Sequence, residues 1–189
     1  DETMKELINA FDNKELIKLD NGFKFIINPL SEQIPCTTSN LLKEACQEII
    51  KRIPKETTKL VTEEDRGAIL VAGTSMITGL PFGMFRWNPN GLPGQVKVSF
   101  SMEYTSGNLY LNGINKNDKV TIIEDMISSG GTLIAMIKAI ENIGAEILCI
   151  ISVAEKINYE GVKRIKDEGY DVISLVKIDV SDEISKVLR

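Results

Sequence analysis

The segment from Val120 to Thr132, VTIIEDMISSGGT, constrains the fold of this chain more than any other. It begins with an apolar run, 120–123, which is typical of a short strand buried in a sheet. Two carboxylates, Glu124 and Asp125, stand at the end of this run, and a loop of small residues leads from there into an amphipathic helix. A strand that runs through a glycine-rich loop into a helix predicts an α/β protein with a ligand site at the carboxyl edge of its sheet.

The residue types in this segment suit a phosphorylated sugar. The loop from Ser128 to Thr132 can point several backbone N–H groups at a phosphate, with help from the helix dipole and from its own hydroxyls. Glu124 and Asp125 stand where they can accept hydrogen bonds from two neighbouring sugar hydroxyls. Two other phosphate-binding patterns are excluded, since the chain has no G-x-x-x-x-G-K-[ST] and no G-x-G-x-x-G after a strand.

Hydrophobic periodicity predicts alternating strands and helices along the rest of the chain. We expect one or two short helices in 1–20 and a helix at 39–53 that is capped by Ser39. Further helices are expected at 68–78, 133–143 and 162–167. We expect strands at 23–27, 59–62, 82–87, 96–100, 109–111, 120–123, 147–154 and 172–178. This alternation predicts a mainly parallel sheet with helices on both faces.

Composition narrows the class of protein. With 189 residues, 43% hydrophobic and 26% charged, the chain suits one ordinary globular domain. The absence of a long apolar run or a signal-peptide pattern predicts a cytoplasmic protein with no membrane partner, and a net charge of −5 argues against nucleic acid. Because the chain has no histidine, proton transfer falls to carboxylates, water or the substrate.

The segment 122–132 resembles the motif by which type I phosphoribosyltransferases bind 5-phosphoribosyl 1-diphosphate (PRPP): a hydrophobic strand, two acids, two apolar residues and a small-small-Gly-Gly-Thr loop. The resemblance implies the fold of that family, a central, mostly parallel sheet flanked by helices, with a small hood. It also implies three segments: amino-terminal helices and hood (1–38), a PRPP-binding α/β core (39–160), and a carboxyl-terminal helix and strand that complete it (161–189).

The same resemblance assigns roles in binding PRPP. The 5-phosphate falls to Ser128, Ser129, Gly130, Gly131 and Thr132, and the ribose hydroxyls fall to Glu124 and Asp125. The diphosphate falls to Asp65, Arg66, Gly67 and Arg86, and it would carry Mg²⁺, with no metal held directly by the protein. A charged loop that simply faces water is the alternative for 63–66.

The segment from Arg86 to Tyr104 is similar to the flexible catalytic loop of the family, although a plain β-hairpin would also fit its alternation. The family usually has one or two lysines directly after this arginine, whereas 87–90 reads WNPN here. We therefore expect weaker electrostatic help for the leaving group. The resemblance makes Glu103 a candidate for proton transfer at the base, beside Asp125 and Arg86 as catalytic residues.

The implied activity is that of a purine phosphoribosyltransferase, a pentosyltransferase of purine salvage that makes a nucleoside 5′-monophosphate and pyrophosphate from PRPP and a purine base. Segments 64–67 and 102–104 favour adenine, whereas 91–95 and 111–114 resemble archaeal-type hypoxanthine/guanine enzymes. A PRPP-sensing regulator without catalysis is a further alternative. We expect Phe25, Ile26 and Ile127 to contact the base, and a homodimer with its contact on the apolar amino-terminal helices.

Overall fold

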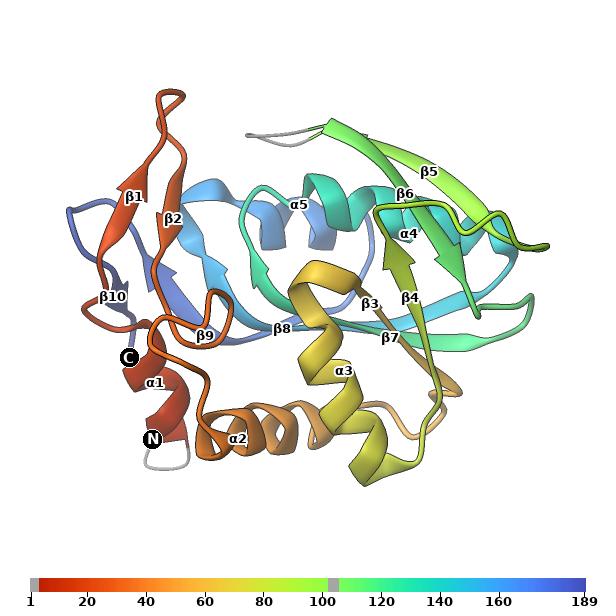
Figure 1. The fold of residues 1–189 in the computed structure, drawn as a ribbon, viewed down its shortest axis with the longest axis horizontal. Helices are drawn as coiled ribbons and strands as arrows, with labels where there is room; N and C mark the ends of the chain where they lie inside the picture. The colour runs from red at the N-terminus through yellow and green to blue at the C-terminus, as the bar shows by residue number, and fades with distance from the viewer. Residues whose placement is uncertain (1–3, 102–105) are drawn as a thin grey trace.

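The computed structural model describes residues 4–101 and 106–189, and an eight-stranded sheet forms its centre (Figure 1). The strand order is β10-β9-β8-β7-β3-β4-β6-β5. The strands are β3 (Lys59–Glu63), β4 (Phe82–Arg86), β5 (Val96–Ser101), β6 (Ser106–Asn112), β7 (Lys119–Ile127), β8 (Glu146–Lys156), β9 (Val172–Asp179) and β10 (Lys186–Val187). Strands β4, β3, β7, β8 and β9 pair in parallel, while β10, β6 and β5 pair antiparallel at the two edges. The predicted, mostly parallel sheet is confirmed.

Helices cover both faces of the sheet (Figure 1). Helices α1 (Lys5–Phe11), α2 (Ser39–Ile50) and α3 (Glu64–Thr78) lie on one face, and α4 (Gly131–Ile143) and α5 (Gly161–Asp167) lie on the other. Each face has its own hydrophobic core. Strand β7 contributes to both, because Ile123 packs with α1, α2 and α3 while Ile122 packs with α4, as side chains of a strand alternate between faces.

A two-stranded antiparallel sheet stands apart from the main one, above the carboxyl ends of β8 and β9 (Figure 1). It consists of β1 (Leu16–Lys18) and β2 (Lys24–Ile26), with Ile17 opposite Phe25. A short 3₁₀ helix, η2 (Ile157–Tyr159), lies next to it, and the hydroxyl of Tyr159 accepts a hydrogen bond from the backbone N–H of Lys24. This small sheet corresponds to the expected hood, and the exact division into three segments stays a prediction.

The structure corrects three local predictions. Residues 16–18 form a strand rather than part of a helix, because their backbone pairs with β2. Thr38, not Ser39, caps α2, and its hydroxyl accepts a hydrogen bond from the N–H of Leu41 at 3.2 Å. Helix α3 begins at Glu64 rather than at Ala68, so the acidic segment 64–67 is its first turn and not a loop. Within the described residues, no helix is long and apolar enough to span a bilayer.

Candidate functional site

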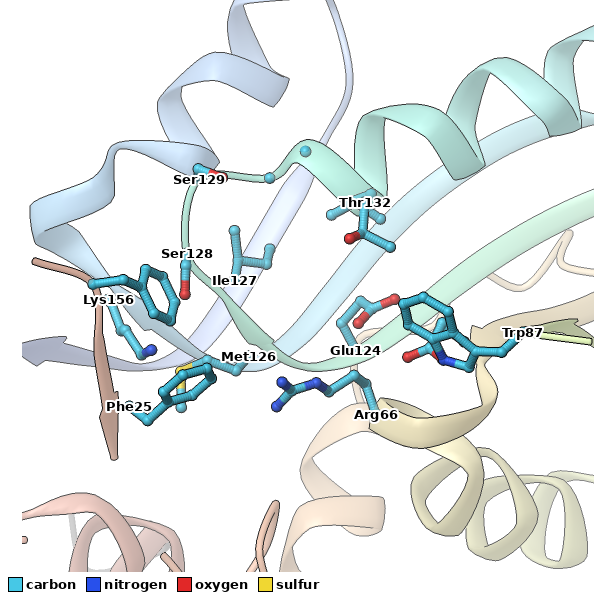
Figure 2. A pocket seen from close by; sticks show the side chains of 15 residues that line it. Phe25, Arg66, Trp87, Glu124, Met126, Ile127, Ser128, Ser129, Thr132 and Lys156 are labelled. Carbon is cyan, nitrogen blue, oxygen red and sulfur yellow. The ribbon is translucent and has the colours of Figure 1, made fainter. Parts of the chain in front are cut away.

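A cavity opens at the carboxyl ends of β3, β7 and β8, beneath the hood (Figure 2). Its wall comes from separate parts of the chain: the hood, the start of α3, the residue after β4, the β7–α4 segment and the end of β8. In Figure 2, Phe25 and Lys156 lie at one end of the cavity, Trp87 lies beside Glu124 at the other, and Arg66 lies between them. This edge is where open α/β sheets bind ligands.

The loop from Ser128 to Thr132 lines the cavity with all of its residues. Gly130 turns the chain into α4 with a left-handed backbone, φ 84°, and a Cβ there would lie only 3.2 Å from Ile165 Cδ1. Glycine is therefore required at this turn. The first N–H groups of α4 have no carbonyl partner within the helix, so this end offers backbone donors and a positive dipole to an anion. The geometry suits the predicted phosphate site.

Glu124 and Asp125 are almost completely buried, at 6% and 1% exposure. Among the described residues, Glu124 Oε1 and both carboxylate oxygens of Asp125 have no hydrogen-bond partner. Burial raises the pKa of Glu124 well above its ordinary value, and the charges of Asp125 and Glu63 add to this. Burial also raises the pKa of Asp125, against the charge of Arg66. Glu124 lines the cavity, whereas Asp125 points toward Arg66, whose Nη1 lies 3.9 Å from Asp125 Oδ2.

The junction between β3 and α3 contributes another acid and the arginine. Glu63 is 1% exposed, so the alternative of a solvated loop is wrong for this residue. Its Oε1 accepts a hydrogen bond from the backbone N–H of Asp65 at 3.1 Å, which caps the helix. Burial raises the pKa of Glu63 to about 7. Arg66 lines the cavity, while the side chain of Asp65 is exposed.

Gly67 sets the distance between α3 and the sheet. A Cβ at this position would overlap Thr62 Oγ1 and would lie 2.9 Å from the carbonyl oxygen of Ile123. The glycine therefore lets the helix approach β3 and β7 closely. Of the four residues predicted to bind the diphosphate, Asp65, Arg66 and Gly67 lie in this one turn, and of the four only Arg66 lines the cavity.

Arg86 and Trp87 follow at the end of β4. Arg86 does not line the cavity; its Nε lies 3.4 Å from Glu64 Oε2, and its side chain is 55% exposed. Trp87 does line it, with its ring edge against Phe100 at 5.0 Å between centroids. Beyond them, β5 and β6 form the hairpin that the alternation allowed, with Val96 opposite Leu111. Glu103 lies outside the described residues, as do the other residues of 102–105.

The hood end of the cavity is aromatic and basic. Phe23 and Phe25 meet edge to face at 4.9 Å, and Lys156 Nζ lies 4.3 Å from the centre of the Phe23 ring. The same ammonium donates a hydrogen bond to the carbonyl of Lys24 at 2.6 Å. Phe25 and Ile127 line the cavity, and their contact with a base stays a prediction. Ile26 does not line the cavity, because alternation along β2 turns it into the core, where it is 3% exposed.

The sequence analysis did not predict Phe23, Glu63 or Lys156 as cavity residues. It noted Trp87 only because the family usually has a lysine at that position, and it did not place Trp87 in the cavity. A signal for Lys156 existed, since it stands two residues after the apolar run 147–154, at the end of a central strand and so at the ligand edge of the sheet. The position of Glu63 gave a similar signal at the end of β3.

Comparison with known proteins identifies relatives over most of the chain. The family model described as phosphoribosyl transferase domain matches residues 38–183. The chain is 40% identical over 179 residues to the hypoxanthine/guanine phosphoribosyltransferase of Methanococcus voltae, and the alignment covers 94% of each chain. It is 45% identical over 162 residues to the protein of the same name from Methanocaldococcus jannaschii, with 85% of this chain and 87% of the relative covered.

Solved structures share the fold at lower identity. Adenine phosphoribosyltransferase from Thermoanaerobacter pseudethanolicus superimposes with a TM-score of 0.76 at 23% identity, covering 92% of this chain and 99% of that one. The enzyme of that name from Rhodothermus marinus gives 0.75 at 22% identity, covering 93% and 98%. At such identities these structures show the fold alone, whereas the sequence relatives carry the family assignment. The chain therefore belongs to the type I phosphoribosyltransferases, a family of pentosyltransferase enzymes, and to their purine branch.

Proposed function

We propose that this protein is a hypoxanthine/guanine phosphoribosyltransferase that forms a nucleoside 5′-monophosphate and pyrophosphate from PRPP and a 6-oxopurine. The similar sequences from Methanococcus voltae and Methanocaldococcus jannaschii carry that name. The adenine preference inferred from the sequence has no support among these relatives. The solved structures of adenine phosphoribosyltransferases are only 23% and 22% identical to this chain, so they do not bear on which base it uses.

Lys156 is the observation that carries the choice of base. Its buried ammonium lies at the hood end of the cavity, beside Phe23 and Phe25, which offer aromatic surface to a flat ring. An ammonium group can only donate hydrogen bonds. The oxygen at position 6 of hypoxanthine or guanine accepts them, whereas the amino group of adenine donates. A lysine at this place therefore favours a 6-oxopurine over adenine.

The geometry suits displacement of pyrophosphate at C1 of the ribose. The loop from Ser128 to Thr132 would hold the 5-phosphate, and Glu124, which lines the cavity, would accept a hydrogen bond from a ribose hydroxyl. Asp125, buried next to it outside the cavity lining, is proposed as the second acceptor. The base nitrogen forms its bond to C1 as the bond from C1 to the diphosphate oxygen breaks, through a transition state that resembles an oxocarbenium ion. Buried carboxylates beside this cation stabilise it more than they stabilise the neutral sugar.

Two further roles complete the mechanism. Arg66, Arg86 and the amino end of α3 would receive the diphosphate as it leaves. The attacking nitrogen loses its proton, for which Glu103, in the segment outside the described residues, stays a candidate. Magnesium, bound on the diphosphate, would neutralise part of its charge. Oxygen ligands suit such a hard cation, and since no three metal-ligating side chains gather among the described residues, the diphosphate oxygens and water would hold it.

The test is pyrophosphate release from PRPP with each of hypoxanthine, guanine, xanthine, adenine and orotate. We expect turnover with hypoxanthine, guanine or both, and little with adenine. Efficient turnover with adenine would contradict the choice of base. Absence of turnover with every base, together with tight PRPP binding, would favour the non-catalytic regulator, which the missing lysines after Arg86 would suit.

We also propose that the protein is a homodimer, but through a different surface from the one the sequence suggested. Leu7 and Phe11 of α1 are fully buried within the monomer and are not available for a partner. Large apolar side chains are instead exposed on α3 and at the start of β4: Ile69, Met76, Ile77 and Phe82. An exposed apolar group of this kind is typical of a protein–protein contact.

A further inference from the structure

Glu64 joins the first turn of α3 to the end of β4. Its Oε1 accepts a hydrogen bond from the backbone N–H of Trp87 at 2.8 Å, and its Oε2 lies 3.4 Å from Arg86 Nε. The strands bring these residues together, since β3 and β4 run parallel with Glu63 opposite Phe85, so that the next residue of each strand lies alongside the other. One carboxylate therefore contacts both residues at the root of the segment that leads into the β5–β6 hairpin.

The contact leaves the anion-binding part of Arg86 available. Glu64 takes only Nε, and the structure shows no partner for the two terminal nitrogens among the described residues. These terminal nitrogens form the planar fork that binds phosphate oxygens in pairs. A long side chain that is 55% exposed would otherwise sample many rotamers.

The need for such an anchor follows from the sequence around it. Trp87, Asn88, Pro89 and Asn90 carry no charge, so Arg86 is the one cation in 86–90 that could meet the diphosphate. When a single cationic side chain binds the diphosphate, its position in the free protein matters, because the entropy lost in ordering it on binding lowers the affinity.

We propose that Glu64 is a positioning residue that holds Arg86 and the backbone of Trp87 so that the guanidinium faces the diphosphate at the amino end of α3. The inference rests on the proposed function. Glu64 does not touch the substrate; it acts through Arg86. The opposite view is that Glu64 is an internal anion that competes with the diphosphate for Arg86, and the two views predict opposite changes in affinity.

The experiment is a double-mutant cycle with Glu64→Ala, Arg86→Ala and the double variant, followed by calorimetric titration with magnesium pyrophosphate and with PRPP. We expect Glu64→Ala to weaken both by roughly five- to tenfold. The double variant should bind no more weakly than Arg86→Ala alone, since Glu64 has nothing left to position. Glu64→Gln, which keeps an acceptor for the Trp87 N–H, should fall between wild type and Glu64→Ala.

Inosine 5′-monophosphate is the matched ligand, because it lacks the diphosphate, and its affinity should not change in any variant. Glu141→Gln on the exposed face of α4 removes the same charge and should bind like the wild type. Additive losses, equal weakening of nucleotide binding, or tighter pyrophosphate binding by Glu64→Ala would overturn the role of Glu64 while leaving an active wild type. A wild type that neither binds pyrophosphate nor turns over would overturn the proposed function and this inference together.

Discussion

Three buried carboxyl groups, Glu63, Glu124 and Asp125, lie close to Arg66 near the carboxyl ends of β3 and β7. Burial raises the pKa of each one, so the folded protein holds these acids at a cost in stability. Acids that are poorly solvated and poorly paired are ready to bind hydroxyl groups and positive charge. At these three residues the protein therefore loses some free energy of folding in exchange for a site that can bind a ligand.

Asp125→Asn tests the acid pair. We expect kcat to fall by about 100-fold or more, because a negative charge beside the developing cation is lost while the shape is kept. Stability should stay the same or rise, since an amide avoids the cost of a buried charge. Steady-state kinetics with thermal unfolding measures both, and Asp167→Asn on exposed α5 is the control. Near-normal turnover would show that the acid pair has another role.

Lys156→Met tests the choice of base, because it removes the donor and keeps an apolar stem of similar length. We expect kcat/KM for hypoxanthine to fall roughly 10- to 100-fold, the scale of a hydrogen bond to a charged group. The KM for PRPP should change little, since Lys156 lies at the hood end of the cavity. Lys163→Met on exposed α5 is the control. An equal loss with PRPP and base would contradict a role in reading the purine.

Glu63 makes stability depend on pH. Its pKa is raised from 4.5 to about 7 in the folded protein, so folding favours the protonated acid. The stabilisation from this proton is complete below about pH 4.5 and is lost as the pH rises to about 7. Glu63→Gln lacks the titration, so its Tm relative to the wild type should be higher at about pH 8 than at about pH 5. Parallel Tm curves for the two proteins would contradict the shift.

At the scale of elements, period and turn residues predicted most of the sheet and its helices. Helix α4 follows its apolar stripe and ends at Gly144, whose left-handed backbone caps it. The start of α3 was missed because the charged run 63–66 looks solvated, whereas Glu63 is buried and caps the helix. Strand β1 was missed because it is defined by its pairing with β2, which the local sequence of 16–18 does not indicate.

Gly161→Ala tests how one element supports another. Gly161 begins α5 directly under the phosphate loop, where an added Cβ would overlap Ser128 O and lie 2.8 Å from both Ile127 Cγ2 and Ser129 C. The loop must shift, so we expect a loss of about 1–3 kcal/mol in the free energy of unfolding and a higher KM for PRPP. Gly107→Ala is the control, since its Cβ would lie 3.7 Å from Phe100. A destabilised variant with an unchanged KM for PRPP would show that contact with Gly161 does not set the position of the phosphate loop.

At the scale of the whole molecule, the sequence predicted most completely the part of the site that is contiguous, and only single residues such as Arg66 and Phe25 elsewhere. Glu124 to Thr132 was predicted because one segment carries the strand, acids and loop together. Lys156 and Phe23 meet only because the end of β8 lies under the hood, and that contact spans more than half the chain. The place of Lys156 at the end of a strand could be predicted, but its contact with Phe23 leaves no local pattern and required the structure.

Association of two copies is the property of the whole molecule that remains to be tested. Met76 and Ile77 are 88% and 61% exposed in the last turn of α3, whereas Leu70, about two turns earlier, is buried in the core. Burying such side chains in a dimer would gain about 25 cal/mol per Å² of apolar surface. We expect the double variant Met76→Asp/Ile77→Asp to be a monomer in sedimentation velocity, since two negative charges from each copy would meet in the interface.

Ile184→Asp, at an exposed site near the carboxyl terminus, is the control and should leave the dimer intact. A wild type that sediments as a monomer at every concentration, or a double variant that stays dimeric, would contradict this surface.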